Sequence, residues 1–98
     1  MTINKTCENN KLKIALEGRL DTTTAPQLDE EVKNIDDNIT SVLMDMKNLE
    51  YVSSAGLRVI LSLHKKMMKK DGLIIKNVND TIKEVFEITG FSDILTIE

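Results

Sequence analysis

Hydrophobic residues alternate with polar ones near the start of the chain. Leu12, Ile14 and Leu16 occupy every second position before Gly18. A period of two is typical of a strand with one buried face, so the pattern predicts a strand that ends at this glycine. The opening segment indicates an earlier strand, joined to this one by a turn at residues 8–10, Glu-Asn-Asn.

A helix is expected next, because the signals of a first helical turn are present. Thr24 and Gln27 have the spacing of a capping box, and Pro26 lies where the missing N–H of proline costs nothing. Apolar residues then recur at helical intervals, which predicts an amphipathic helix that runs to about residue 35. These apolar residues are Ala25, Leu28, Val32 and Ile35.

The clearest helical pattern lies further along, after a short apolar run at residues 41–46. That run, SVLMDM, predicts a strand covered on both faces. From about Ala55, apolar side chains fall on one half of a helical wheel and basic ones on the other, until Asp71 and Gly72 end the helix. The apolar half holds Leu57, Val59, Ile60, Leu61, Leu63, Met67 and Met68.

The rest of the chain predicts three more elements. Residues 73–78, LIIKNV, indicate a buried strand. A helix over residues 82–89 follows, with Asp80 or Thr81 near its cap. Residues 94–97 are expected to form a final short strand.

The predicted order is β-β-α-β-α-β-α-β, which describes a single small α/β domain over residues 1–98. Strand-helix-strand units require right-handed crossovers, so we expect a mixed, mostly parallel sheet whose first strand is antiparallel. Ninety-eight residues are enough for one core. Ligands and partners of such sheets meet the loops at the carboxyl ends of the strands. Both RLDTTT at 19–24 and YVSSAG at 51–56 are predicted to lie there.

Composition and charge narrow the functional classes. Aromatic residues make up 3% of the chain and the formal net charge is -3, which disfavours nucleic acid as a partner. No apolar run approaches the roughly 20 residues that cross a bilayer, and the start lacks a secretory pattern, so we expect a cytoplasmic protein without membrane contact. One cysteine, Cys7, and one histidine, His64, are too few for a zinc site. We expect no metal and no cofactor, since nucleotide-binding glycine motifs are also missing.

Two adjacent serines, Ser53 and Ser54, stand between a predicted strand and the helix that follows. A serine at the helix N-cap accepts a backbone N–H, and its replacement by alanine costs about 1 kcal/mol. Only one of the two can be the cap. The other is left exposed at the positive end of the helix dipole, a position that favours an anion such as a phosphoryl group.

A catalytic serine is disfavoured by the surrounding sequence. The G-x-S-x-G pattern of a hydrolase needs glycine where this chain has Val52. The only histidine, His64, lies on the same predicted helix, about 15 Å from Ser54 along its axis. Its place among apolar positions indicates a packing role. We therefore expect no enzyme activity.

Three segments together resemble the STAS domain of bacterial anti-sigma factor antagonists, and the resemblance covers nearly the whole chain. In chain order they are LEGRLDTTTAPQL, VLMDMKNLEYVSSAGLRVIL and EVFEITGFSDILTI. The resemblance implies a mixed sheet with helices, in agreement with the hydrophobic pattern. It also implies a partner-switching regulator of transcription. In such a system the unphosphorylated protein binds an anti-sigma factor that is also a serine kinase, which frees the sigma factor.

The same resemblance implies which residues act. The kinase phosphorylates a serine at the position of Ser54, which ends the interaction, and a PP2C-type phosphatase reverses the change. Ser53 stands where well-known members have an acidic residue, and it is the alternative phosphate acceptor. The partner-binding residues carried over by position are Asp21, Thr22, Thr23, Ser53, Ser54, Gly56, Leu57 and Arg58.

Several of these residues have a second interpretation. Asp21, Thr22 and Thr23 also suit a turn or a helix cap. Arg58 also suits a solvated basic face, and Leu57 suits the core. The missing acid before the phosphate acceptor keeps a second class of function open, namely an unphosphorylated scaffold subunit of a larger signalling assembly. In both cases we expect a monomer or a weak dimer.

Overall fold

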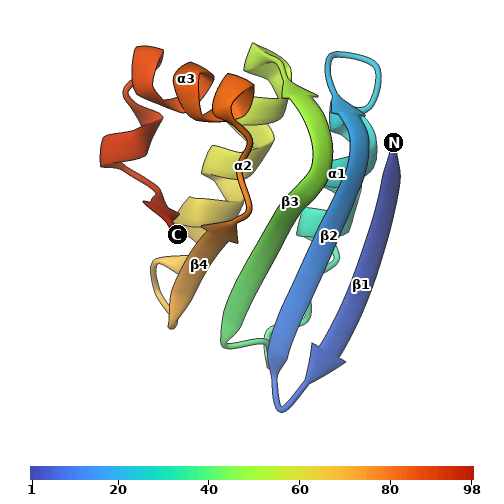
Figure 1. Ribbon diagram of the computed structural model, residues 1–98. Helices are drawn as coiled ribbons and strands as arrows, with labels where there is room; N and C mark the ends of the chain where they lie inside the picture. The colour runs from blue at the N-terminus through green and yellow to red at the C-terminus, as the bar shows by residue number, and fades with distance from the viewer.

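The computed structural model describes all of residues 1–98, with strands and helices in the predicted order (Figure 1). The elements are β1 (Thr2–Glu8), β2 (Lys11–Leu20), α1 (Ala25–Lys33), β3 (Ser41–Val52), α2 (Ser54–Met67), β4 (Gly72–Lys76), α3 (Asp80–Ile88), the short 3-10 helix η1 (Phe91–Asp93) and β5 (Thr96–Ile97).

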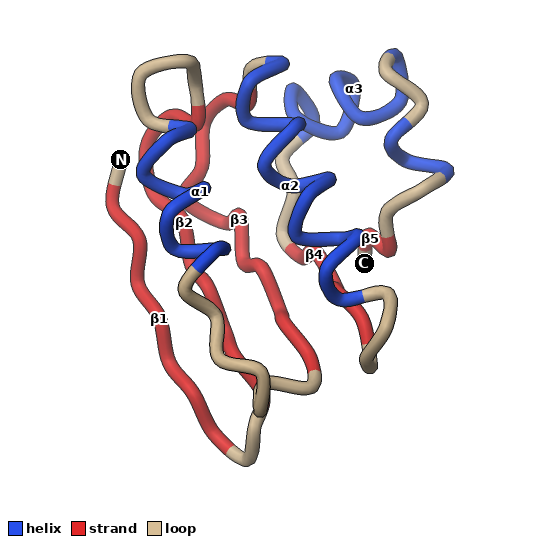
Figure 2. Tube along the Cα trace, turned by 180° about the vertical axis from the view of Figure 1, so that it is seen from behind, coloured by secondary structure: helices blue, strands red, loops and turns tan.

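The five strands form one sheet in the order β1-β2-β3-β4-β5. β1 is antiparallel to β2 and the other neighbours are parallel, which confirms the predicted mixed, mostly parallel sheet. Seen from behind, α1 and α2 lie side by side over one face of the sheet (Figure 2). α3 packs against β3 at the upper end of the sheet in Figure 1. None of the helices is long and apolar enough to cross a membrane.

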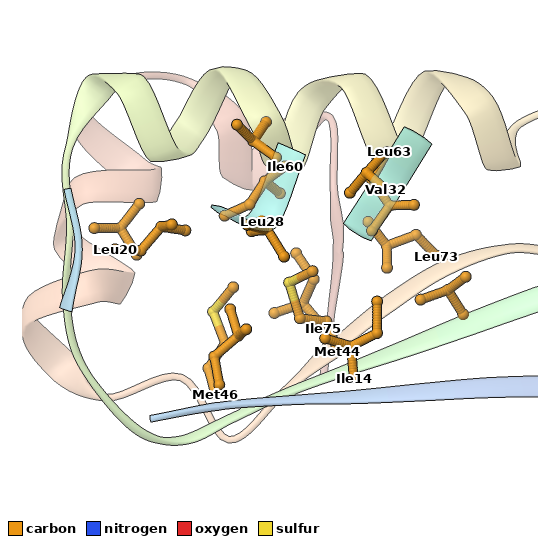
Figure 3. Packing of buried hydrophobic residues seen from close by; sticks show 14 of the residues in the cluster. Ile14, Leu20, Leu28, Val32, Met44, Met46, Ile60, Leu63, Leu73 and Ile75 are labelled. Carbon is orange, nitrogen blue, oxygen red and sulfur yellow. The ribbon is translucent and has the colours of Figure 1, made fainter. Parts of the chain in front are cut away.

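A core of 23 buried hydrophobic residues fills the space between the helices and the sheet. Ile60 and Leu63 point from α2 toward the sheet, where Ile14, Met44 and Ile75 lie on three neighbouring strands (Figure 3). All five side chains are 0% exposed. The period of two in the strands and of 3.6 in the helix places them on facing surfaces.

β3 is longer than predicted, since it runs to Val52 and not to Met46. Two β-bulges, after Ala15 and after Gly18 of its partner strand, each give β3 one extra residue relative to β2. Its last buried positions are therefore spaced by three residues instead of two. The apolar run that predicted this strand ends at the first bulge. The prediction that both faces of the strand are covered is wrong, because buried residues alternate with partly exposed ones from Ser41 to Met46. β2 likewise continues past Gly18, to Leu20.

The capping box predicted at the start of α1 is wrong. The side chain of Thr24 makes no cap hydrogen bond, and its hydroxyl donates to the Arg19 carbonyl oxygen at 2.8 Å. The Gln27 amide donates to the Met1 carbonyl oxygen at 3.3 Å. Both side chains thus form hydrogen bonds with segments outside α1, and neither bonds to the N–H groups of the first turn of the helix. The helix ends at Lys33, two residues before its predicted end.

The cap of α3 directly precedes Asp80, one of the two residues predicted to lie near it. Asn79 is the cap, and its Oδ1 accepts a hydrogen bond from the Ile82 N–H at 2.8 Å. Its Nδ2 donates to the Leu49 carbonyl oxygen on β3 at 3.0 Å. One amide side chain therefore both starts the helix and fastens it to the sheet.

Asp45 lies on the face of the sheet that the helices leave uncovered, between two buried neighbours of β3. Its Oδ1 accepts hydrogen bonds from Asn77 Nδ2 at 2.9 Å and from the Lys47 N–H at 3.0 Å. These two bonds, that of Asn77 first, lower the pKa of the Asp45 carboxyl. Asn77 has a left-handed backbone, φ 61°, which ends β4 at Lys76 instead of at residue 78.

Several other boundaries differ from the prediction by a few residues, and α3 spans Asp80–Ile88 where residues 82–89 were predicted. α2 ends at Met67, before the Asp71-Gly72 stop signal. β5 is limited to Thr96–Ile97, because η1 and the turn after it occupy the residues before.

Candidate functional site

The ends of β2 and β3 bring the two candidate loops together. Leu20 and Val52 are paired in these parallel strands, and the Ser53 N–H donates to the Leu20 carbonyl oxygen at 2.8 Å. The loop at residues 21–24 and the start of α2 therefore lie side by side, at the upper end of the sheet in Figure 1. The structure thus brings the two segments to the carboxyl end of the sheet, as predicted.

The two serines have different roles at the start of α2. Ser53 has an extended backbone, φ −92° and ψ 175°, and its Oγ accepts a hydrogen bond from the Gly56 N–H at 3.4 Å. Ser54 is the first helical residue, its side chain is exposed, and its hydroxyl makes no hydrogen bond within the chain. One serine is the cap, as predicted, and the other presents a bare hydroxyl at the positive end of the helix dipole.

Gly56 and Leu57 are buried beneath the exposed serine. The backbone of α2 approaches Leu20 so closely at Gly56 that a side chain there would collide with it. Leu57 is 4% exposed and belongs to the core, which is one of the two interpretations that the sequence allows. These two residues support the site from the core side, and neither contributes to its exposed surface.

Asp21 organises the loop between β2 and α1. Its Oδ1 accepts hydrogen bonds from the Thr23 hydroxyl at 2.7 Å, the Thr23 N–H at 3.0 Å and the Thr24 N–H at 3.2 Å. These bonds, that of the Thr23 hydroxyl first, lower the pKa of the Asp21 carboxyl below its usual value. The contacts support the turn interpretation of Asp21 and Thr23, and they give the loop a fixed shape beside the serines.

Thr22 and Arg58 line a shallow groove between α1 and α2. Both side chains are exposed, and Asp29 of α1 lines the same groove, whose apolar floor includes Ala25 and Val59. Thr22 makes no side-chain hydrogen bond. The groove therefore adds an exposed hydroxyl and an exposed guanidinium to the surface around the serines.

Arg19 and Tyr51 form a contact at this edge that the sequence pattern does not reveal. The Cζ of Arg19 lies 4.8 Å from the centroid of the Tyr51 ring. The Nε of Arg19 lies 3.8 Å from Oδ2 of Asp21. The second β-bulge of β3 pairs Arg19 with Tyr51, where a regular register would pair it with Glu50. Simple alternation along the two strands therefore does not predict that Arg19 and Tyr51 are neighbours.

Other chemically active side chains lie away from this edge. His64 is half-buried near the far end of α2, and Cys7 is an exposed free thiol on β1. No group of three or more His, Cys, Asp or Glu side chains is placed to hold a metal ion. The candidate site is thus a surface built around one serine hydroxyl.

Comparison with protein families identifies the fold to which this edge belongs. The family model of the STAS domain matches residues 2–98. This chain belongs to the STAS domain family. The serine-bearing edge at the start of α2 is therefore part of a STAS domain, and the resemblance noted in the sequence is confirmed.

Similar proteins with this STAS domain are named as anti-sigma factor antagonists. The chain is 36% identical over 84 residues to BtrV of Bordetella bronchiseptica, whose name assigns it to that class; the match covers 84% of this chain and 72% of BtrV. It is 28% identical over 99 residues to the anti-sigma-B factor antagonist of Staphylococcus aureus, which covers 99% of this chain and 92% of that protein.

Solved STAS-type structures share the fold. An anti-sigma factor antagonist from Mycobacterium paratuberculosis has a TM-score of 0.88 at 18% identity, and the match covers 98% of this chain and 83% of that one. SpoIIAA of Bacillus has a TM-score of 0.76 in both its unphosphorylated and its phosphorylated form, at 17% and 18% identity. These two matches cover 99% of this chain and 87% and 91% of SpoIIAA.

Proposed function

We propose that this STAS domain is an anti-sigma factor antagonist that works by partner switching. Its unphosphorylated form binds an anti-sigma factor that is also a serine kinase, and thereby releases the sigma factor. The names of the relatives in Bordetella and Staphylococcus support this class of partner. The chain supplies a binding surface, so the proposal needs no catalysis by the chain itself.

The observation that carries the proposal is the bare hydroxyl of Ser54. A kinase must be able to reach the acceptor hydroxyl, and Ser54 is exposed and free of hydrogen bonds within the chain. Ser53 is less suited, because its Oγ already accepts the Gly56 N–H as the helix cap. A phosphate on Ser54 adds about -1.5 to -2 charge at the positive end of the α2 dipole, where negative charge is tolerated. Ser54 is therefore the proposed acceptor.

The switch acts at the interface and needs no refolding. A partner surface shaped for a neutral hydroxyl has to desolvate or repel the phosphate, and a loss of about 3 kcal/mol of binding lowers affinity more than 100-fold. Both forms of SpoIIAA match this chain with the same TM-score, 0.76, which supports a fold that is kept in both states of that relative.

Partner contact is proposed for exposed or half-exposed side chains around Ser54. These belong to Asp21, Thr22, Thr23 and Arg58. Residues 1–98 act as one domain, as a monomer or a weak dimer in the cytoplasm, and a PP2C-type phosphatase restores the unphosphorylated form.

Intact-mass measurement tests the proposal. The wild-type chain and its Ser54→Ala and Ser53→Ala variants are incubated with ATP and the anti-sigma factor kinase encoded in the same genome. We expect one added phosphate on the wild type and on Ser53→Ala, and none on Ser54→Ala. Titration calorimetry with the same kinase then compares both forms of the wild type, and equal affinities would contradict the proposed switch.

A second candidate is an unphosphorylated scaffold subunit of a larger signalling assembly. It is favoured by Ser53, which stands where well-known members carry an acidic residue and which serves here as a helix cap. No phosphate on any of the three chains, with a kinase that is active on another substrate, would support this candidate over partner switching.

A further inference from the structure

We infer that Arg19 and Tyr51 form a second contact site for the anti-sigma factor, in which Arg19 binds a carboxylate of that partner. The inference rests on the proposed function, because it concerns the same partner and the same end of the sheet. It extends the binding surface from the serines onto the face of the sheet that the helices leave uncovered.

The position of the pair makes the two surfaces continuous. Arg19 and Tyr51 are paired near the carboxyl ends of β2 and β3. The next residues, Leu20 and Val52, point into the core, so the pair faces the opposite side of the sheet. Tyr51 is two residues from Ser53, and Arg19 lies 3.8 Å from the carboxylate of Asp21 in the neighbouring loop. A partner that covers Asp21 therefore also meets the guanidinium.

The contact with Tyr51 favours one position of the guanidinium before any partner binds. Arg19 is exposed, whereas Tyr51 is half-buried and provides a ring face 4.8 Å from the Cζ atom of the arginine. A side chain that is already ordered loses less conformational freedom on binding. Arginine and tyrosine are also enriched among the residues that contribute most to interface affinity.

The free donors of Arg19 point to a carboxylate as the bound group. Only its Nε approaches an acid, at 3.8 Å from Oδ2 of Asp21, and the other oxygen of that acid is occupied by Thr23 and Thr24. The two terminal nitrogens of the guanidinium make no hydrogen bond within the chain. Their planar fork matches the two oxygens of a carboxylate.

The second β-bulge is the feature that creates this site. It leaves Glu50 as the extra residue of β3 and moves Tyr51 opposite Arg19. A regular register would place the acid of Glu50 in that position instead. β-bulges are a common means of re-aiming a side chain near a functional site.

Titration calorimetry with the purified anti-sigma factor of the same genome tests the inference. Arg19→Ala is expected to weaken binding at least about tenfold, which corresponds to about 1.4 kcal/mol. Arg19→Glu should weaken it further, because it repels a carboxylate. Arg19→Lys should restore only part of the affinity, and Tyr51→Leu should weaken binding several-fold. The matched control is Lys11→Ala, which removes the same charge from the other end of β2 and should change affinity less than about twofold.

The outcomes separate this inference from the proposed function. Equal affinities for Arg19→Ala and Lys11→Ala would overturn the inference, and so would equal affinities for Arg19→Glu and Arg19→Ala, since a carboxylate would then not face the arginine. In another outcome, the wild type binds the anti-sigma factor and loses this binding when Ser54 is phosphorylated, while the Arg19→Ala variant binds with the same affinity as the wild type. In that case only the inference fails. If the wild type does not bind the anti-sigma factor at all, both fail. Thermal melts of each variant verify that the fold is kept.

Discussion

A Cβ atom on Gly56 would lie 2.6 Å from Cγ of Leu20 and 3.1 Å from its carbonyl oxygen. That carbonyl also accepts the N–H of Ser53. The first turn of α2 is therefore pressed against the end of β2, and this contact sets where Ser54 lies relative to the loop that contains Asp21.

Gly56→Ala is expected to destabilise the protein, by about 1–3 kcal/mol in urea unfolding. Alanine favours a helix by about 1 kcal/mol over glycine, but the added methyl group must displace Leu20, which is fully buried. Leu20→Ala makes room for that methyl group, so the double variant should lose less stability than the sum of the two single ones.

Ser62→Ala is the control for this prediction, because Ser62 is exposed on the same helix and its replacement should change stability by less than about 0.5 kcal/mol. A Gly56→Ala protein that is more stable than the wild type would show that α2 does not approach β2 so closely.

Alanine substitutions of the two serines should lower the free energy of unfolding by different amounts. Ser53→Ala removes the cap of α2 and should cost about 1 kcal/mol, whereas Ser54→Ala removes an unpaired hydroxyl and should cost less than about 0.5 kcal/mol. Ser53→Asp is the matched control, since aspartate is also a good cap and should keep most of the stability. Equal losses for the two alanine variants in urea unfolding would contradict these assignments.

Much of the fold could be predicted from periodicity, because an element that buries one face has hydrophobic residues at regular intervals in its sequence. Ile14 and Ile60 are examples: the strand period and the helix period each predict their burial, and both are fully buried. The prediction of β3 stopped at Met46, where a bulge changes the spacing of buried residues. A bulge depends on pairing with another strand, which no pattern within β3 alone records.

The site was predictable to the extent that local chemistry determines it. A serine before a helix predicts a cap, and Ser53 is that cap. Asn79 and the pair of Arg19 with Tyr51 depend on contacts between segments far apart in the chain, and these were missed. Asn79 is a good cap residue by itself, but neighbouring Asp80 and Thr81 are as well, and its tie to β3 decides among them.

Asn79 is expected to contribute through two separate hydrogen bonds. Asn79→Ala removes both the cap of α3 and the bond to Leu49, and should cost about 1–2 kcal/mol. Asn79→Asp keeps the cap but loses the donor to the Leu49 carbonyl, so its stability should be intermediate. Urea unfolding of the three chains tests this order, and an Asp variant as unstable as the Ala variant would show that the cap contributes little.

Acid should weaken the fold partly through Asp21 and Asp45. Hydrogen bonds lower the pKa of both carboxyls in the folded chain below the ordinary value of 3.8. A group whose pKa is lower in the folded than in the unfolded state adds stability above the unfolded pKa, and this is lost as the pH falls through the folded pKa. The free energy of unfolding should therefore decrease as the pH falls below about 4.

Asp45→Asn isolates one of these contributions. The amide oxygen of asparagine can still accept the hydrogen bonds of Asn77 and Lys47 but carries no charge, so the variant should be less stable than the wild type at pH 7 and lose less stability between pH 5 and 3. Asp37→Asn is the control, because its carboxylate makes no hydrogen bond or ion pair, and its pH dependence should follow the wild type more closely. Urea unfolding across this pH range measures the slopes. If Asp45→Asn and the wild type show the same slope, the charge of Asp45 contributes nothing to the stability of the folded sheet.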